Sequence, residues 1–224
     1  MLVQSPVQAR SVQTRPAKPV AGPVLSGPIE LMGATVPYCR NAEIYGENEP
    51  ADFLYKVISG TVRTYKVLSD GRRQIGAFYL PGDLFGIETG ASHSFSAEAI
   101  SNVKVLVIRR SSVTALVARD PASAQLLLGA TMRELARAQT YIMLLIKTAQ
   151  ERVAGFLLEM ADRVAGHNEV DLPMSRQDIA DYLGLTIETV SRTLTQLEHA
   201  CTIALPTSRR IELRNRGALH RLNS

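Results

Sequence analysis

Three residues with complementary hydrogen-bonding groups, Glu188, Ser191 and Arg192, lie close together near the C-terminus of the sequence. Arg192 follows Glu188 by four residues, so in a helix both side chains project from nearly the same face. A guanidinium donates two hydrogen bonds to O6 and N7 of guanine, and a carboxylate accepts one from N4 of cytosine. These residue types therefore suit the edges of DNA bases. The alternative interpretation is an ordinary ion pair on a solvated helix face.

Two short predicted helices would position these side chains. Ser175 is a favourable N-cap with Asp178 in the place of a capping-box partner, and Gly184 permits the left-handed backbone that ends a helix. Thr186 caps the second helix. The apolar faces of the two helices consist of Ile179, Ala180, Leu183, Val190, Leu194 and Leu197. A glycine-containing turn between two short helices predicts a helix-turn-helix, whose second helix enters the DNA major groove. A plain helical hairpin is the alternative.

Residues around this motif are candidates for further DNA contacts. Two predicted strands, Thr202–Leu205 and Arg210–Leu213, form a small hairpin that would act as a wing beside the DNA. Basic and polar side chains at such positions mostly contact phosphates, which orient the protein without reading sequence. The expected additional DNA contacts are Arg176, Gln177, Ile187, Thr189, Thr195 and Arg209.

Composition restricts the class of protein. The net charge is +4, but the region from Thr148 to the end is close to neutral, so composition alone supports DNA binding only weakly. The longest apolar stretch, Tyr141–Ile146, is far too short to span a membrane, and the N-terminus lacks a signal-peptide pattern. We therefore expect a cytoplasmic protein without membrane contact, in which Cys39 and Cys201 are free thiols. A buried thiol is expected for Cys201, with an oxidation-sensitive switch as the alternative.

The N-terminal half is expected to be rich in strands. Met1–Pro28 has no hydrophobic periodicity and is predicted to be a disordered tail. Residues 29–118 contain short strands separated by turn residues, and Asp70-Gly71 predicts a hairpin. The predicted strands are Phe53–Ile58, Thr61–Leu68, Arg73–Leu80, Phe95–Ile100 and Val103–Ile108. Their even spacing indicates a sandwich or a jelly-roll β-barrel, so the fold class is α+β.

A long helix is predicted to connect the two halves of the chain, within residues 119–147. Asp120 is its N-cap, Pro121 occupies its first position, and it continues to about Lys147. One stripe follows a heptad spacing with a polar interruption at Gln139, and it consists of Leu128, Met132, Leu135, Gln139, Ile142 and Ile146. We interpret this stripe as a dimer interface. Packing against the helix's own domain is the alternative. Residues 148–224, which begin with an amphipathic helix over Gln150–Val164, would form the DNA-binding domain.

This order of parts resembles the CRP/FNR family of bacterial transcription regulators over about Tyr38 to Leu213. The most specific stretches are Pro81-Gly-Asp-Leu-Phe-Gly, Glu151-Arg-Val-Ala-Gly-Phe-Leu-Leu and Glu188-Thr-Val-Ser-Arg. The Glu-x-x-Ser-Arg pattern resembles the FNR and FixK members, which recognise a TTGAT…ATCAA palindrome. The resemblance implies a cyclic-nucleotide-binding-like N-terminal domain and a winged helix-turn-helix. It also implies a homodimer that activates transcription through RNA polymerase, with contacts at the Asp70-Gly71 turn and the Arg163–Asp171 loop.

The resemblance also bears on the signal that such a regulator senses. Cyclic-AMP binders in the family hold the cyclic phosphate with an Arg-Ser pair, whereas this chain has His93-Ser94, with Glu88 nearby. A mostly neutral imidazole cannot replace a bidentate guanidinium. Two cysteines cannot supply the four thiolates of an iron–sulfur cluster. The pattern therefore indicates a FixK-like regulator of low-oxygen and nitrogen-fixation genes, without a cofactor. The alternative is a ligand-gated regulator that responds to a small molecule or, through His93 or Cys39, to a haem-bound gas.

The sequence gives no indication of an enzyme. It contains no GxSxG, HExxH, CxxC, P-loop or GxGxxG pattern, and its four histidines are widely separated. Glu43, Glu47 and Glu49 are interpreted as a solvated acidic patch rather than a metal site. A protein-interaction module with a degenerate DNA domain is a third possibility, and it predicts no specific DNA binding.

Overall fold

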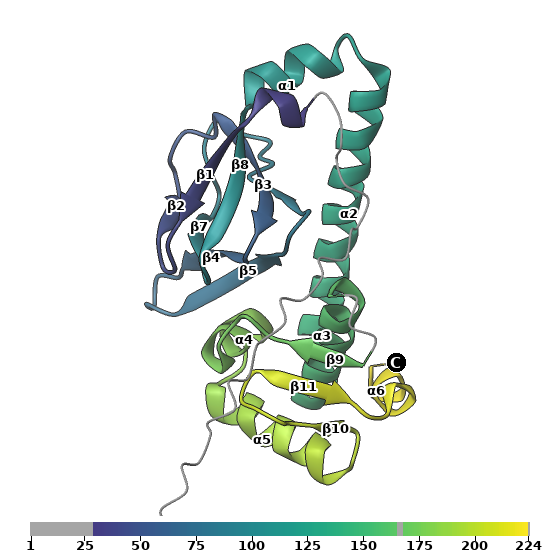
Figure 1. Ribbon diagram of the computed structural model, residues 1–224. Coiled ribbons are helices and arrows are strands. Elements are labelled where there is room, and N and C mark those ends of the chain that lie inside the picture. Colours follow the sequence, from purple (N-terminus) through teal and green to yellow (C-terminus); the bar gives the residue numbers. More distant parts are fainter. Residues whose placement is uncertain (1–28, 165–167, 224) are drawn as a thin grey trace, which may run out of the picture.

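The computed structural model describes residues 29–164 and 168–223, which form a strand-rich part and a mainly helical part connected by one long helix (Figure 1). We refer to the strand-rich part, residues 34–109, as the sheet domain. The predicted tail, Met1–Pro28, lies outside the described residues, as does the segment 165–167. The expected order of a sheet domain, a long helix and a helix-turn-helix with a small hairpin is confirmed.

The sheet domain contains two four-stranded antiparallel sheets rather than one continuous hydrogen-bonded barrel. The first sheet has the order β1 (Ala34–Tyr38), β8 (Val103–Arg109), β3 (Phe53–Ser59), β6 (Leu84–Phe85). The second has the order β2 (Glu43–Tyr45), β7 (Ser96–Ala99), β4 (Val62–Val67), β5 (Arg73–Tyr79). Buried side chains from both sheets, including Val57, Val62, Phe85 and Val105, form the core between them.

All five predicted strands exist, and three further strands were not predicted. Strands β2 and β6 contain only three and two residues, which is too short for a periodic pattern. Strand β1 contains Pro37, which lacks an N–H donor and is tolerated because β1 lies at the edge of its sheet. The predicted Asp70-Gly71 turn joins β4 and β5, and Gly71 adopts a φ of +83°.

The connecting helix begins as predicted. The helices after the sheets are α1 (Arg110–Val117) and α2 (Pro121–Leu145). The Asp120 side chain accepts hydrogen bonds from the backbone N–H groups of Ala122 and Ser123 at the start of α2. The helix ends at Leu145, two residues before the predicted end, because Thr148 already caps the following helix. One side of α2 packs on the sheet domain through buried Ala130 and half-buried Leu127. Near the end of α2, buried Leu144 belongs instead to the core cluster of the C-terminal part.

The C-terminal part has a single core made of helices and a three-stranded sheet. Its elements are α3 (Ala149–Arg163), β9 (Glu169–Asp171), α4 (Arg176–Leu183), α5 (Ile187–His199), β10 (Ile203–Ala204), β11 (Arg210–Leu213) and α6 (Arg216–Leu222). The predicted hairpin is present as β10 and β11, and the unpredicted strand β9 pairs with β11. Among the described residues, no helix is both long and apolar enough to cross a membrane.

Candidate nucleic-acid interface

The caps predicted for the two-helix motif are present. The Ser175 hydroxyl accepts a hydrogen bond from the Asp178 N–H at 3.1 Å, and the Asp178 carboxylate accepts one from the Ser175 N–H at 3.0 Å. Gly184 ends α4 in the left-handed conformation with φ +63°. The Thr186 hydroxyl accepts from the Thr189 N–H at 3.2 Å and starts α5. Local chemistry therefore fixes the turn between the two helices.

The left-handed backbone at Gly184 leads to a stability prediction. A Cβ built at Gly184 would make only ordinary contacts, so Gly184→Ala carries mainly the backbone cost of about 1–2 kcal/mol. Thermal unfolding should show a lower Tm for Gly184→Ala. The control is Gly217→Ala, because Gly217 lies inside α6, has no positive φ and leaves room for a Cβ. An unchanged Tm for Gly184→Ala would contradict the assigned role of this glycine.

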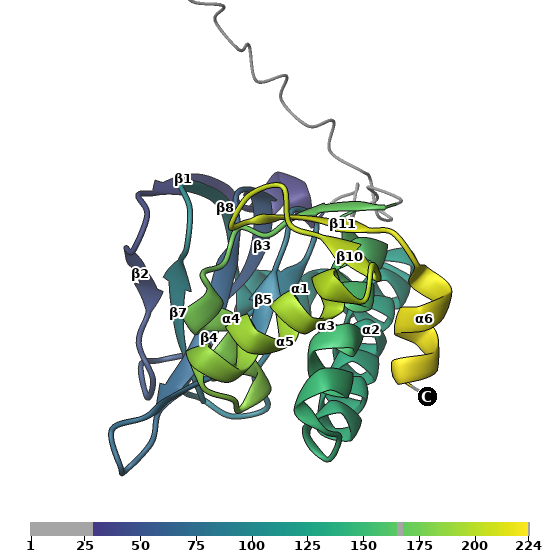
Figure 2. The same cartoon turned by 90° about the horizontal axis from the view of Figure 1, so that it is seen from below.

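The apolar face of α5 is buried against α3 and α4, which leaves its polar face outside. Ala180 is fully buried, so the two helices approach closely. Figure 2, which views the molecule from below, shows α5 in front of α3 with the β10–β11 hairpin beside it. The buried stripe of α5 consists of Val190, Leu194 and Leu197, as predicted. The helix therefore presents its other face at the end of the molecule that lies farthest from the sheet domain.

The three predicted base-reading residues lie on this outer part of α5. Glu188 and Arg192 are exposed and Ser191 is half-buried. Within the described part of the chain, no ion pair joins Glu188 to Arg192. Thr195, one turn further, is exposed and its hydroxyl donates to the Ser191 carbonyl at 3.1 Å. The arrangement leaves a carboxylate and a guanidinium available to an external partner.

The other predicted DNA contacts occupy the rim of this surface. Gln177 is exposed, although its side-chain amide donates to Asp181 at 2.6 Å, and Arg176 is half-buried. Ile187 is 37% exposed at the start of α5, and Thr189 is half-buried. Arg209 is exposed in the loop between β10 and β11. A cation at the tip of the hairpin suits a phosphate better than a base edge.

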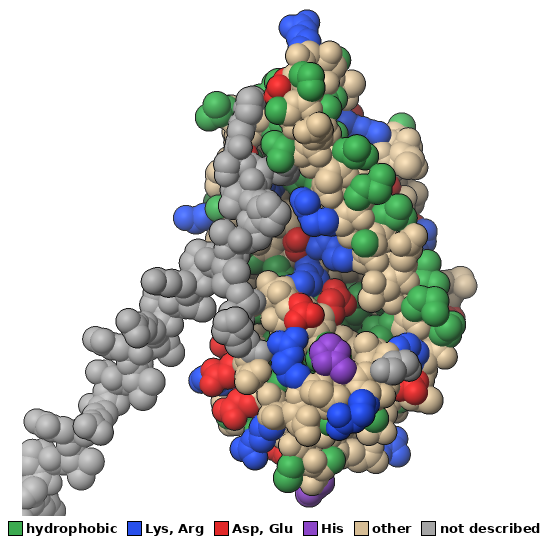
Figure 3. Space-filling view, turned by 90° about the vertical axis from the view of Figure 1, so that its right-hand side faces the viewer, with side chains coloured by type: hydrophobic (Ala, Val, Ile, Leu, Met, Phe, Trp, Pro, Cys, Tyr) green, Lys and Arg blue, Asp and Glu red, His purple; other side chains and the backbone are tan. Residues whose placement is uncertain are grey.

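The predicted dimer stripe is exposed along α2. Its five apolar members are 50–74% exposed, and Gln139 is exposed as well. Figure 3 shows hydrophobic side chains at several places on the face that includes α2. The apolar side chains of the stripe are Leu128, Met132, Leu135, Ile142 and Ile146. The alternative interpretation, in which this stripe packs on the sheet domain, is wrong, because other α2 residues form that contact.

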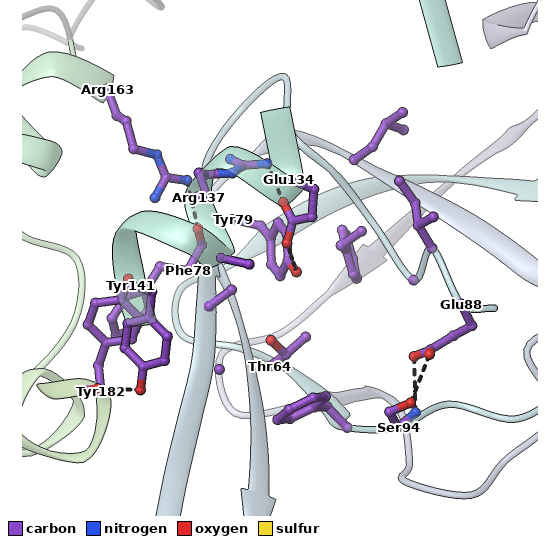
Figure 4. Close-up of a pocket in the computed structure, with 18 of the residues that line it drawn as sticks. Thr64, Phe78, Tyr79, Glu88, Ser94, Glu134, Arg137, Tyr141, Arg163 and Tyr182 are labelled. Carbon is purple, nitrogen blue, oxygen red and sulfur yellow. Dashed lines mark hydrogen bonds and ion pairs between the residues drawn. The ribbon is translucent and has the colours of Figure 1, made fainter. Parts of the chain in front are cut away.

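A cavity of about 370 Å³ lies where the sheet domain, α2, α3 and α4 meet (Figure 4). Aromatic rings line much of it, and both of its arginines are already paired. Arg137 lies 2.8 Å from Asp83, and Arg163 lies 2.7 Å from the same carboxylate. Arg163 also contacts Glu159, whose pKa is raised by burial. Neither guanidinium in this cavity is therefore available as a free partner for a phosphate.

His93 and Ser94 were compared above with the Arg-Ser pair that holds the cyclic phosphate in cyclic-AMP binders. In this structure the Glu88 carboxylate occupies the hydrogen-bond donors of Ser94. Glu88 accepts hydrogen bonds from the Ser94 N–H at 3.0 Å and from the Ser94 hydroxyl at 2.9 Å (Figure 4). His93 is 1% exposed and stacks on Tyr45 with 3.6 Å between ring centroids. Neither ring nitrogen of His93 has a hydrogen-bond partner among the described residues. Burial lowers the pKa of His93, and the nearby Glu88 offsets this only partly.

This pKa shift predicts how stability depends on pH. The unfolded chain binds the His93 proton more tightly than the folded chain, so protonation favours unfolding. The free energy of unfolding should therefore decrease as pH falls below about 6.5, the unfolded pKa of histidine. His93→Phe keeps the stacking and removes the titrating group, so its stability should fall less over the same range. Denaturant melts at several pH values measure this, and parallel curves for the two proteins would contradict it.

The expectation of a buried Cys201 is wrong, because both cysteines are exposed and free. Cys201 follows the end of α5 with a φ of +54°, and this left-handed turn directs the side chain to solvent. The acidic patch is also only partly solvated. Glu47 pairs with Lys66 at 2.7 Å, and Glu49 accepts from the Gly46 N–H. No group of three or more potential metal ligands occurs within residues 29–164 and 168–223.

Two family models match the chain. Residues 35–120 match the cyclic nucleotide-binding domain, and residues 151–222 match the Crp-like helix-turn-helix domain. The chain is 50% identical to the nitrogen fixation regulation protein FixK of Azorhizobium caulinodans, over 96% of this chain and 86% of that protein. It is 41% identical to the protein of the same name from Rhizobium meliloti, over 88% of this chain and 91% of that protein.

Solved structures agree with these relatives. The structure of FixK2 from Bradyrhizobium japonicum is similar with a TM-score of 0.82 and 51% identity, covering 86% of this chain and 98% of that one. These relatives are named as regulators, so the expectation that the chain is not an enzyme is confirmed. The chain belongs to the CRP/FNR family of DNA-binding transcription regulators, in its FixK-like subgroup.

Proposed function

We propose that the protein binds a TTGAT-N4-ATCAA-like palindrome as a homodimer and activates genes of low-oxygen metabolism and nitrogen fixation. The observation that carries this proposal is that Glu188 and Arg192 are exposed on α5, with no ion pair to any described residue, while the apolar face of α5 is buried. In the proposed complex Glu188, Ser191 and Arg192 read base edges of each half-site. Arg176, Gln177, Ile187, Thr189, Thr195 and Arg209 surround them and contact mainly the DNA backbone. The names of the FixK relatives support the biological setting.

The dimer follows from the exposed stripe on α2. Two copies pairing along this stripe would bury ten apolar side chains that one chain leaves in water, and each would contribute favourable transfer free energy. A two-fold axis would then place two α5 helices on successive turns of the major groove, as a palindrome requires. We assign residues 29–118, which contain the sheet domain and the short helices on either side of it, to an N-terminal domain. Residues 119–147 are assigned to dimerisation and residues 148–224 to DNA binding.

Activation would require contact with RNA polymerase, for which the exposed turn at Asp70 and Gly71 is a suitable surface. The loop Arg163–Asp171 is the second proposed surface, and its residues 165–167 lie outside the described part of the chain. Both contacts would take place in the cytoplasm, where a bacterial regulator meets DNA. Alanine substitution of Arg72 next to the first turn should reduce transcription in vitro without reducing DNA binding.

We propose further that DNA binding needs no small-molecule effector. Glu88 already occupies the two donors of Ser94. Arg137 is paired with Asp83 and Glu134, and Arg163 is paired with Asp83 and Glu159. A cyclic phosphate entering there would face the Glu88 carboxylate, and each arginine among the described residues that line the cavity is already paired. The rival is a regulator gated by a small molecule or a haem-bound gas. It predicts that purified protein binds the palindrome only after a ligand is added.

A fluorescence anisotropy titration of the palindrome with purified full-length protein tests both ideas. We expect specific binding without added ligand, equal affinity with and without cyclic nucleotides, and equal affinity under oxidising and reducing conditions. Binding that appears only with a ligand would support the gated alternative. An absence of sequence preference under every condition would instead indicate a protein-interaction module.

A further inference from the structure

A cluster of buried and partly buried ion pairs joins the sheet domain to the first helix of the DNA-binding motif. Arg63 on β4 contacts Asp178 on α4 at 2.6 Å, and Arg73 on β5 contacts the same oxygen at 2.7 Å. Arg73 also contacts Asp181, one helical turn further, at 2.7 Å. We call these four residues, Arg63, Arg73, Asp178 and Asp181, the clasp. Asp178 is only 4% exposed, so its charge depends on these partners.

The clasp acts directly on the helix-turn-helix motif. Asp178 uses its other carboxylate oxygen to complete the capping box with Ser175 at the start of α4. At the end of α4 the side chain of Gln74, the neighbour of Arg73 on β5, donates to the Asp181 carbonyl at 2.7 Å. The Tyr141 hydroxyl donates to the Tyr182 carbonyl at 2.8 Å. Both ends of α4 are therefore held by residues outside the DNA-binding domain.

A second set of contacts, centred on Asp83, also connects the sheet domain to the helical part of the chain. Asp83, in the turn before β6, bonds Arg163 on α3 and Arg137 on α2. Arg163 also donates to the Phe78 carbonyl of β5 at 2.6 Å (Figure 4). Between these polar contacts, the Phe78 ring lies 5.2 Å from that of Tyr182. The junction combines apolar packing with ion pairs whose geometry specifies one orientation.

While the clasp holds α4 against the sheet domain, the proposed DNA-reading face of α5 stays open to solvent. Glu188 and Arg192 stay exposed while α4, on the opposite side of the motif, is held against β4 and β5 (Figure 1). The connection between α2 and α3 is only three residues long, 146–148. Without the clasp, rotation about this connection would change the direction of α5 relative to the dimer helix. In a palindrome the two reading helices must be about 34 Å apart, so such rotation matters.

We propose that Arg63 and Arg73 of the sheet domain are positioning residues for DNA reading, which hold α4 so that the two α5 helices of the dimer match the spacing of the half-sites. The proposal rests on the proposed palindrome-binding function. The arginines act through Asp178 and Asp181 and do not touch DNA. Arg73 bonds both aspartates, so without it Asp178 keeps Arg63 while Asp181 loses the ion pair that the described residues give it. An aspartate that is mostly buried is costly to leave without its cation, so the contact between α4 and β5 is weakened. A sheet-domain substitution should therefore alter spacer preference, whereas a purely stabilising role would alter only Tm.

The test compares Arg73→Gln with Arg72→Gln on palindromes whose spacers contain three, four or five base pairs. Arg72 is the matched control, because among residues 29–164 and 168–223 its one ion pair is with Asp70 in its own turn. For wild type and Arg72→Gln we expect a clear preference for one spacer. For Arg73→Gln we expect the affinity for the preferred spacer to fall at least about tenfold, which is about 1.4 kcal/mol. The affinities for the other two spacers should change less. Arg73→Lys, which can keep one ion pair, should restore part of the preference.

A second measurement needs no DNA and separates failure of this proposal from failure of the proposed function. Cys39 in the sheet domain and Cys201 after α5 are free and exposed, so both accept nitroxide spin labels. We expect a narrow distance distribution between them in wild type and Arg72→Gln, and a broad one in Arg73→Gln. If Arg73→Gln does not fold, Asp181→Asn replaces it, because Asp178 and its cap stay intact. Wild-type spacer preference together with an unchanged distance distribution in the folded variant would overturn the proposal.

Discussion

Replacing Arg192 with alanine is expected to eliminate sequence-specific DNA binding while the protein stays folded. Arg192 is exposed and no intramolecular bond of its side chain is seen among the described residues, so its removal costs the fold little. A bidentate contact to guanine contributes about 1–3 kcal/mol of discrimination, and a dimer loses two of them. The loss is then about 2–6 kcal/mol, or at least about thirtyfold in Kd. Anisotropy titrations on the palindrome measure it.

Arg209→Ala is the matched control for this experiment, because Arg209 is also an exposed arginine and lies in the loop between β10 and β11. A phosphate contact there would weaken specific and random duplexes alike, and each lost contact lowers the salt slope by about 1. The ratio of specific to non-specific affinity should therefore fall for Arg192→Ala and stay constant for Arg209→Ala. The assignment of Arg192 as a base reader is wrong if its variant retains the wild-type ratio.

Leu135→Asp is expected to convert the dimer into monomers. In a single chain the Leu135 side chain is 50% exposed, so the substitution scarcely affects the monomer. In a paired stripe it would bury two carboxylates at the symmetric contact. Losing two buried leucines alone costs more than about 4 kcal/mol, roughly a thousandfold in the dimer Kd. Sedimentation equilibrium measures the dimer, and palindrome affinity should fall with it.

Two further variants on α2 show whether the stripe itself is responsible. Thr140→Asp adds the same charge at an exposed position beside the stripe, where the threonine hydroxyl donates to the Ala136 carbonyl of its own helix. It should remain dimeric. Gln139→Leu removes the polar interruption and should strengthen the dimer. A Leu135→Asp protein that sediments as a dimer would show that another surface joins the two chains.

Local chemistry explains why the helix-turn-helix could be predicted from sequence. The caps at Ser175 and Thr186 and the left-handed residue Gly184 act within a few residues, so their pattern is visible in the sequence. The exposed stripe on α2 was predicted for the same reason, since a heptad spacing is local. Short strands such as β9 carry no such signal, because three residues cannot show periodicity.

Contacts between distant segments could not be predicted in this way. The clasp joins Arg63 and Arg73 to Asp178, residues more than 100 positions apart, and each resembles an ordinary surface charge in the sequence. The one available signal was that Arg63 lies inside the predicted strand Thr61–Leu68, directly after Val62. Glu88 was placed near the effector region from sequence, but its bonds to Ser94 depend on how the loop folds back. Cys201 was assigned to the interior because free cysteines are usually buried, and the positive φ after α5 was not foreseen.

The central claim is that Arg192 reads the guanine of each half-site, and a double-mutant cycle tests it most directly. The cycle measures Kd for wild type and Arg192→Ala, each on the palindrome and on a duplex in which both guanine–cytosine pairs are replaced by adenine–thymine pairs. If Arg192 contacts that guanine, the base change should weaken wild type strongly and the variant hardly at all, so the two losses are not additive. Equal losses in wild type and variant would contradict the claim.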